Sequence, residues 1–340
     1  MRAAVFHGPR DVRVEDVPEP AAPAQGEVLL EVLRAAICGT DASEWDHGPV
    51  LCRPGVVLGH EFVGRVVDVG GDVTGIRAGD RVVSGAGISC GHCFWCLRGR
   101  TNLCAEYRTL GLQVDGGLAE YVTSPASICR SVPDTCDDDA AAMAQPLAVA
   151  LHALSRVAQR SDDAVAVIGA GGIGSFIVAG ASHRAAEGRV VAVDIDEGRL
   201  ATASTLGATE TANAAGRDLA ELLLELSDGV GFDVVIEAAG VPPAMASAFP
   251  IAGLGARLVF VGIDVGGTTP VEIGLVQSKA LRVKGIIGSA GLWPRTIRFM
   301  ATSGVDPTPL LSATFPLGDG TSALEAARDT ARNVKVQIEC

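Results

Sequence analysis

The first 135 residues alternate short apolar runs with polar and turn-forming residues, a pattern typical of β-strands. The runs are rich in β-branched side chains and are separated by Gly, Pro and Asp. The pattern predicts strands at 28–32, 62–69, 81–84 and 120–123, with turns between them. This part of the chain is therefore expected to be β-rich.

The pattern changes near residue 140, where apolar positions spread over about five helical turns and Pro146 predicts a kink or a restart. From residue 164 strand-like runs alternate with helical ones, which predicts βαβ units and a parallel sheet. The expected strands are 164–168, 189–193, 232–236, 257–262 and 281–287, and the expected helices are 173–186, 196–206, 217–226 and 243–252. The last 50 residues mix expected helices (291–303, 319–332) with short strands (312–315, 334–338).

Composition adds limits to this picture. A chain of 340 residues is long enough for about two domains. The formal net charge of −13 would repel the phosphates of nucleic acids and anionic membranes, so neither is an expected partner. Residues 164–181 carry no charge, but five of them are glycines, which favours a strand, a turn and a helix over a membrane span.

The number of cysteines bears on the redox state of the compartment in which the protein is expected. Nine is an odd number, so complete internal pairing is impossible, and a reducing cytoplasm is expected. Residues 1–17 contain no apolar core of the length that a signal peptide needs.

A glycine-rich loop opens the α/β part. Gly169, Gly171 and Gly174 lie between an expected strand and an expected helix, and Asp194 follows Gly174 by 20 residues at the end of the next strand. That context matches the fingerprint of a dinucleotide-binding βαβ unit, in which a pyrophosphate binds the helix N-terminus and the acid binds the adenosine ribose. The Asp194 carboxylate would repel the 2′-phosphate of NADP. A glycine-rich turn in a domain without a cofactor is the alternative.

Four cysteines, Cys90, Cys93, Cys96 and Cys104, fall within 15 residues with the spacing C-x2-C-x2-C-x7-C. Four thiolates at this spacing can surround one tetrahedral Zn²⁺ as a closed, structural site. A disulfide pair and an iron–sulfur cluster are the alternatives. His92, between two of the cysteines, is expected to be a loop residue and not a fifth ligand.

A second cluster combines Cys38, Thr40 and Asp41 with His60 and Glu61. Each of these residues alone has an ordinary explanation, such as a buried thiol or a loop histidine. Together, in a β-rich domain attached to a dinucleotide fold, they indicate a second zinc site that keeps an open position.

This set of motifs resembles the zinc-dependent medium-chain alcohol dehydrogenases, and within them the polyol, butanediol and threonine dehydrogenase branch. The likeness extends over essentially the whole chain. It is carried by residues 1–5, 12–18, 59–61, the four-cysteine segment, 146–152, the Gly169 loop, 193–196, 235–240 and 334–338.

The resemblance implies an α/β protein made of two domains. A GroES-like, β-rich catalytic domain would comprise 1–146 and 288–340, with a structural zinc lobe at about 88–106. A Rossmann domain with a doubly wound parallel sheet would comprise 147–287. The family likeness also implies a homodimer or a homotetramer.

The resemblance assigns roles residue by residue. Cys38 and His60 match zinc ligands, and Glu61 matches the carboxylate that ligates or supports the metal. Asp41 matches the acid that takes the imidazole N–H of the ligand histidine, and Thr40 matches the hydroxyl that touches the substrate oxygen and starts a proton relay. The expected NAD contacts are Gly169, Gly171, Gly172, Ile173, Gly174, Asp194, Arg199 and Val261.

Two positions depart from the family pattern. The branch commonly has Glu where this chain has Gln145, near or on the zinc, and His where this chain has Ser43, at the end of the relay. A glutamine can still offer a carbonyl oxygen, and a serine can still pass a proton through water. Both changes remove a titratable group, so the rate and pH dependence of the family do not transfer directly.

Three further features have weaker interpretations. Residues 44–47 are expected to form a loop that either lines the substrate pocket or is solvated. His152 lies on an apolar helix and is expected to be packed or partly exposed and not a ligand. The remaining cysteines fit no metal spacing: Cys52, Cys129, Cys136 and Cys340.

The predicted activity is hydride transfer between NAD(H) and a secondary alcohol or ketone, with a polyol, cyclitol or sugar-like substrate and two zinc ions per chain. Two alternatives remain at this level. One is an enone or quinone reductase on the same fold, and the other is a non-catalytic dinucleotide-binding or sensor protein, which Gln145 and Ser43 suggest.

Overall fold

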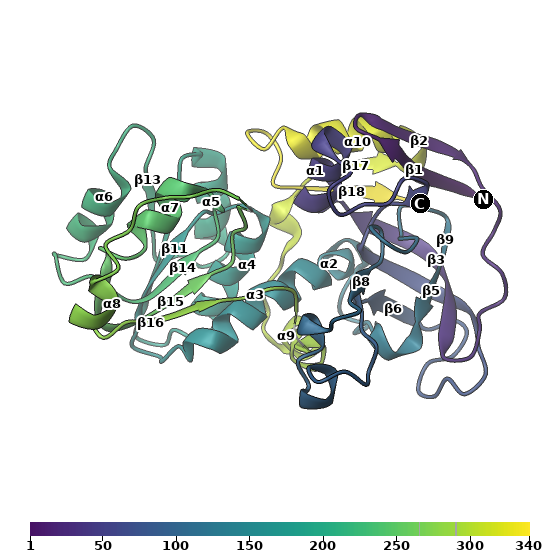
Figure 1. The fold of residues 1–340 in the computed structure, drawn as a ribbon, viewed down its shortest axis with the longest axis horizontal. Helices are drawn as coiled ribbons and strands as arrows, with labels where there is room; N and C mark the ends of the chain where they lie inside the picture. The colour runs from purple at the N-terminus through teal and green to yellow at the C-terminus, as the bar shows by residue number, and fades with distance from the viewer. Residues whose placement is uncertain (265, 290) are drawn as a thin grey trace. The chain divides into compact units, whose positions relative to one another are not determined.

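The computed structural model describes residues 1–264, 266–289 and 291–340 (Figure 1). The chain divides into two compact units. The first comprises Met1–Ala148 and Ala290–Cys340, and the second comprises Val149–Ser289. Each unit is described by itself below.

The first unit is built on sheets that are antiparallel except for the parallel pair β17 and β18. Its largest sheet has seven strands in the order β10-β6-β5-β3-β18-β17, with β9 also paired to β3. The strands are β3 (Glu27–Ala36), β5 (Glu61–Val69), β6 (Arg81–Ser84), β9 (Tyr121–Pro125), β10 (Cys129–Ser131), β17 (Leu311–Pro316) and β18 (Lys335–Glu339). Because β18 pairs with β3, the end of the chain lies against residues near its beginning.

Two smaller sheets and several helices complete this unit. One sheet has the order β2-β1-β4, and the other pairs β7 with β8. The strands are β1 (Arg2–Gly8), β2 (Asp11–Asp16), β4 (Val56–Val57), β7 (Gly87–Ile88) and β8 (Arg108–Thr109). The helices are α1 (Gly39–His47), α2 (Asp138–Ala142), α9 (Trp293–Thr302) and α10 (Gly320–Arg328). Helix α3 (Ala144–Val157) begins in this unit and continues into the second.

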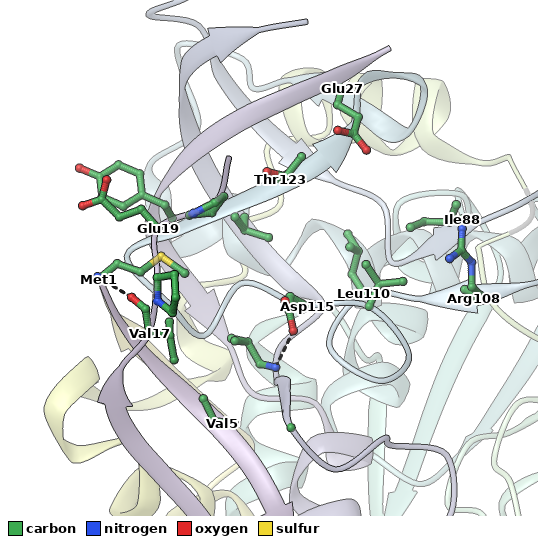
Figure 2. A pocket seen from close by; sticks show the side chains of 18 of the residues that line it. Met1, Val5, Val17, Glu19, Glu27, Ile88, Arg108, Leu110, Asp115 and Thr123 are labelled. Carbon is green, nitrogen blue, oxygen red and sulfur yellow. Dashed lines mark hydrogen bonds between the residues drawn. The ribbon is translucent and has the colours of Figure 1, made fainter. Parts of the chain in front are cut away.

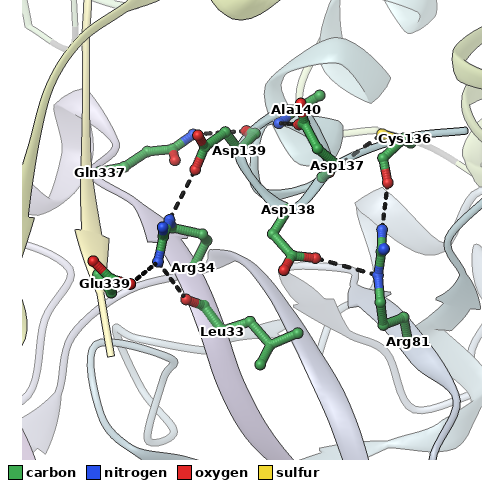
Figure 3. A network of polar contacts seen from close by, with 10 residues as sticks. All are labelled: Leu33, Arg34, Arg81, Cys136, Asp137, Asp138, Asp139, Ala140, Gln337 and Glu339. Carbon is green, nitrogen blue, oxygen red and sulfur yellow. Dashed lines mark hydrogen bonds and ion pairs between the residues drawn. The ribbon is translucent and has the colours of Figure 1, made fainter.

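A polar network fastens the start of α2 to the large sheet (Figure 3). Arg34 on β3 donates to Asp139 at 2.8 Å and pairs with Glu339 on β18 at 3.0 Å. Gln337 donates to the carbonyl oxygen of Asp139 at 2.7 Å, and Arg81 on β6 pairs with Asp138 at 3.2 Å. Three strands therefore hold one short helix in place.

The second unit contains one six-stranded parallel sheet in the order β13-β12-β11-β14-β15-β16. The strands are β11 (Ala164–Ile168), β12 (Arg189–Asp194), β13 (Glu210–Asn213), β14 (Phe232–Glu237), β15 (Ala252–Phe260) and β16 (Arg282–Gly285). The helices after α3 are α4 (Gly172–Ser182), α5 (Glu197–Thr205), α6 (Leu219–Leu226), α7 (Pro242–Ser247) and α8 (Leu275–Ser278). The central strands are nearly all apolar and buried, as expected for a parallel sheet covered on both faces. The prediction of βαβ units is confirmed.

The structure corrects several element predictions. Two strands at the N-terminus, β1 and β2, lie where the sequence analysis named no strand, although it expected this part of the chain to be β-rich. The predicted helix 140–157 is interrupted at Met143 and not at Pro146, because Pro146 lies in the first turn of α3, where no N–H is needed. Helices 173–186, 243–252 and 319–332 end earlier than predicted, at Ser182, Ser247 and Arg328.

Among the described residues, no helix combines the length and the apolar character that a membrane crossing would require. The uncharged run at 164–181 is strand β11, the glycine turn and helix α4.

Candidate active site

Three side chains from two neighbouring strands converge in the first unit. Cys38 immediately precedes α1, just beyond the end of β3, and His60 and Glu61 lie at the start of β5. Strands β3 and β5 are antiparallel, and Ala36 is paired with Glu61, so the pairing brings the three residues together. Their ligand atoms lie within 4.8 Å of one another, and His60 and Glu61 are buried. Sulfur, imidazole nitrogen and carboxylate oxygen together form a donor set that suits Zn²⁺.

Asp41 connects two of these residues. One oxygen of its fully buried carboxylate accepts a hydrogen bond from the backbone N–H of Cys38 at 2.9 Å, and the other lies 3.4 Å from Nδ1 of His60. Burial alone would lower the pKa of His60, but the negative charges of Asp41 and Cys38 raise it well above its usual value. With its Nδ1 proton directed at Asp41, the imidazole would present Nε2 to a metal.

Lys335 is a member of this cluster that the sequence analysis did not identify. Its buried ammonium forms an ion pair with the Glu61 carboxylate and donates to the carbonyl oxygen of Ile37 at 3.1 Å. Burial would lower the pKa of Lys335, but the charges of Glu61 and Cys38 raise it above its usual value. The signal was present, since Lys335 belongs to the matched segment 334–338, but its partner lies about 270 residues earlier in the chain.

The expected relay residues lie on the same short helix as Asp41. Thr40 is half-buried in the first turn of α1, whereas Ser43 is exposed to solvent. Gln145 is half-buried and is the second residue of α3. The structure thus places all three residues in or at the edge of the first unit, with Ser43 at its surface.

The prediction of a loop at residues 44–47 is wrong. These residues form the last turn of α1, and Glu44 and Trp45 are buried. The Glu44 carboxylate accepts hydrogen bonds from the backbone N–H groups of Val50, Leu51 and Cys52 at 2.8–3.1 Å. Its role is structural, because it holds the chain that follows the helix.

The four-cysteine segment forms a second possible metal site. The sulfur atoms of Cys90, Cys93, Cys96 and Cys104 lie within 4.8 Å of one another, with 3.5 Å between Cys93 and Cys96 and 3.9 Å between Cys90 and Cys96. A tetrahedral Zn²⁺ with Zn–S bonds of about 2.3 Å separates its sulfur ligands by roughly 3.8 Å. None of the described cysteines forms a disulfide. The segment therefore fits a four-thiolate zinc site.

Backbone N–H groups already favour the thiolate of one cysteine in this segment. Those of Cys96 and Ala105 lower the pKa of Cys93 to about 6. His92 is exposed and lies 3.8 Å from Glu106 at the surface, consistent with a loop residue. Outside the segment, burial raises the pKa of Cys52 to about 12, of Cys136 to about 11 and of Cys340 to about 12.

In the second unit the glycine-rich loop joins β11 to α4. Gly169 has a φ of +94°, and a Cβ there would lie 2.6 Å from the backbone nitrogen of Ala239. A Cβ at Gly174 would lie 1.8 Å from the carbonyl oxygen of Gly169, whereas one at Gly171, the residue preceding α4, would meet open space. Gly172 and Ile173 form the first turn of α4. The loop has the shape of a phosphate-binding turn at a helix N-terminus.

Asp194 ends the neighbouring strand β12. One carboxylate oxygen accepts from the backbone N–H of Ala170 at 2.8 Å, which fastens Asp194 to the glycine loop. Arg199, on the helix that follows β12, lies 3.7 Å from the other oxygen. Val261 follows β15, and its N–H donates to the carbonyl oxygen of Glu237 at 2.8 Å.

His152 is packed, as expected. It is buried in the second unit, its Nδ1 lies 2.7 Å from the carbonyl oxygen of Gly288, and its Nε2 accepts from Arg156 at 3.0 Å.

A cavity of about 740 Å³ lies elsewhere in the first unit (Figure 2). It is lined by residues of β1, β9 and the segments around them, including Val5, Glu19 and Thr123. Its lining includes none of the four cysteines and none of Cys38, His60 and Glu61. The cavity is therefore separate from the two metal-type sites.

Comparisons with known proteins identify the family of the chain. Residues 24–134 match the family model of the alcohol dehydrogenase GroES-like domain, and residues 172–302 match that of the zinc-binding dehydrogenases. The chain is 31% identical to the sorbitol dehydrogenase of Bacillus subtilis over 96% of its own length and 93% of the relative's. It is 35% identical to the L-threonine 3-dehydrogenase of Shewanella woodyi over 92% of both.

A solved structure shows the same fold. A short chain alcohol dehydrogenase from E. coli CFT073, complexed with NADH, superposes with a TM-score of 0.93 at 28% sequence identity. The match covers 100% of this chain and 99% of that one.

Proposed function

The chain belongs to the zinc-dependent medium-chain alcohol dehydrogenases, and from that premise we propose that it acts on a polyol, cyclitol or sugar-like secondary alcohol, or on the corresponding ketone. It is an alcohol oxidoreductase that uses a nicotinamide dinucleotide. The observation that carries the proposal is the convergence of Cys38, His60 and Glu61, with Asp41 behind them, in a chain that also has a dinucleotide loop.

The residues fit a catalytic zinc. We propose that Cys38, His60 and Glu61 hold it, and that Gln145 lies close enough to contribute an amide oxygen or to bind a substrate hydroxyl. A zinc ion in such a site supplies Lewis acidity toward the alcohol oxygen, and a bound nicotinamide ring accepts the hydride. The four-thiolate segment would hold a second, structural zinc.

Residues of the chain itself would orient the metal ligands and transfer the proton of the substrate hydroxyl. Asp41 fixes the tautomer of His60 through Nδ1 and holds the backbone N–H of Cys38. The half-buried Thr40 hydroxyl would accept the proton of the substrate hydroxyl while it releases its own proton toward water. Ser43, which is exposed, would pass that proton on to solvent in the same way. Lys335 neutralises the charge of Glu61, so the buried carboxylate still has an ion-pair partner when it does not ligate a metal.

Cofactor choice is the second part of the proposal. Asp194 would bind the adenosine ribose hydroxyls and repel a 2′-phosphate, so NAD should be preferred over NADP. Arg199 beside Asp194 offsets part of that repulsion, since it lies 3.7 Å from the carboxylate. Asp194→Ala should reduce the preference for NAD over NADP, measured as the ratio of kcat/KM for the two cofactors. Equal efficiency with both in the native protein would contradict this part.

We also propose a homodimer or homotetramer in the cytoplasm. Strand β16 forms one edge of the parallel sheet, and all four of its residues are exposed. Such an edge presents unpaired backbone groups that a second copy can pair. All nine cysteines are free, which suits a reducing compartment. Light scattering should give the mass of a dimer or tetramer.

The experiment that tests the activity combines metal analysis with turnover of NAD(H) over a panel of polyols, simple alcohols, ketones and enones. Two zinc ions per chain and turnover of secondary alcohols support the proposal. Enone reduction without a metal requirement would favour the reductase alternative. Dinucleotide binding without turnover of any panel member would favour the sensor alternative.

A further inference from the structure

Glu237 is a buried acid that the proposed mechanism does not use. It is the last residue of β14 and is fully buried. It belongs to the segment 235–240, one of the stretches that carry the family likeness. A carboxyl group without exposure costs free energy unless hydrogen bonds compensate, so its contacts should explain its presence.

The carboxyl group organises the turn that follows β14. Its Oε1 accepts hydrogen bonds from the backbone N–H groups of Ala239 at 2.9 Å and Gly240 at 2.7 Å. The backbone carbonyl of Glu237 accepts from Val261 at 2.8 Å and from Gly262 at 3.2 Å, both beyond the end of β15. One residue therefore joins the loop after β14 to the loop after β15.

The loops around Glu237 are packed without spare room. A Cβ on Gly262 would lie 2.2 Å from the nitrogen of Gly240 and 2.7 Å from Oε2 of Glu237. A Cβ on Gly169, in the dinucleotide loop, would lie 2.6 Å from the nitrogen of Ala239. A shift of the turn at 239–240 would therefore displace both its neighbours.

The position of this cluster in the sheet gives it a role. The strand order places β14 next to β11, where the sheet changes its direction of winding, and ligands of such sheets bind beyond the carboxyl ends of the strands at that point. Asp194 ends β12, on the other side of β11. If Asp194 takes the adenosine half of a dinucleotide, the loops after β14 and β15 face the other half.

We propose that Glu237 is a positioning residue that fixes the loops 237–240 and 261–262 for the nicotinamide half of the bound dinucleotide. The inference rests on the proposed use of a dinucleotide and adds a residue that does not touch it. Burial raises the pKa of the Glu237 carboxyl, and the N–H groups of Gly240 and Ala239 oppose that rise.

The test measures binding by calorimetry with two probes, NADH and AMP, because AMP carries only the adenosine half. Glu237→Ala leaves two buried N–H groups without an acceptor and should weaken NADH binding about tenfold or more. Its affinity for AMP should stay within about threefold of the native protein. Glu237→Gln keeps an acceptor oxygen and should recover most of the NADH affinity.

Asp233→Ala is the matched control. Asp233 lies on the same strand, is exposed, and accepts from the N–H of Ala164 at 2.9 Å. It should leave both affinities unchanged, and thermal melting of each variant reports its folding. Unchanged NADH affinity in folded Glu237→Ala, or an equal loss for NADH and AMP, would overturn the proposal. Failure of the native protein to bind either probe would instead overturn the proposed function.

Discussion

The two metal-type sites of the first unit differ in how the chain builds them. The four cysteines come from 15 consecutive residues of a partly exposed loop, and backbone N–H groups stabilise the thiolate of Cys93. Cys38, His60 and Glu61 come from two strands, are largely enclosed, and have Asp41 and Lys335 beside them. The first site depends on local spacing, whereas the ligands of the second come together only when β3 and β5 are paired, and β18 then adds Lys335. Loss of metal should therefore affect them differently.

The largest expected effect separates the two sites by activity. His60→Ala removes a ligand from the enclosed site, and turnover should fall by about 10³-fold or more, since Lewis acidity is worth several kcal/mol. One zinc equivalent should remain, held by the four cysteines. His92→Ala, at an exposed histidine of the loop, is the control and should keep both activity and metal. Substantial turnover in zinc-poor His60→Ala would contradict the site assignment.

The next effect concerns the loop. Cys104→Ser should lose the other zinc equivalent and lower the melting temperature by roughly 5 °C or more, because binding of a structural metal is coupled to local folding. Proteolysis should then cut within 88–106, while the zinc of the enclosed site is retained. Cys340→Ser, outside both metal groups, serves as control. If the loop stays protease-resistant without its metal, it does not depend on zinc for its fold.

A smaller effect should appear at Lys335. Lys335→Met leaves the Glu61 carboxylate buried beside Cys38 and Asp41 without its cation, at a cost of about 3–5 kcal/mol of unfolding free energy in metal-free protein. Added Zn²⁺ should restore much of that loss, so the gap in stability between metal-free and metal-loaded protein widens. Urea unfolding with and without zinc measures this gap, and Lys284→Met, on the exposed strand β16, is the control. Equal losses in both forms would mean that Lys335 acts only through packing.

The smallest effect is expected at Gln145. We predict that Gln145→Glu raises the apparent pKa of alcohol oxidation by about one unit, because a negative charge near the metal disfavours loss of the substrate proton. The pH–rate profile, at constant zinc content, measures the shift. An unchanged profile with unchanged turnover would mean that the difference from the family's Glu is neutral drift.

The fold class followed from pattern because parallel strands such as 164–168 and 232–236 are mostly apolar and alternate with helices. The short, charged elements β1, β2 and α1 were not predicted, because strand pairing and packing stabilise them more than a periodic sequence pattern does. Spacing alone suggested the four-cysteine group. The matched segment 334–338 includes Lys335, but its contact with Glu61 was not predicted, since that contact depends on the pairing of β18 with β3.

The placement of Lys335 on β18 also has a consequence for biosynthesis. Cys38, His60 and Glu61 are synthesised about 270–300 residues before Lys335. At 5–20 residues per second, that interval is roughly 14–60 s. During this time Cys38 and Glu61 are present in the nascent chain without Lys335. A divalent cation can then bind them before the lysine is available as a counter-charge. We therefore expect the order of translation to favour metal binding before the ammonium of Lys335 joins the site.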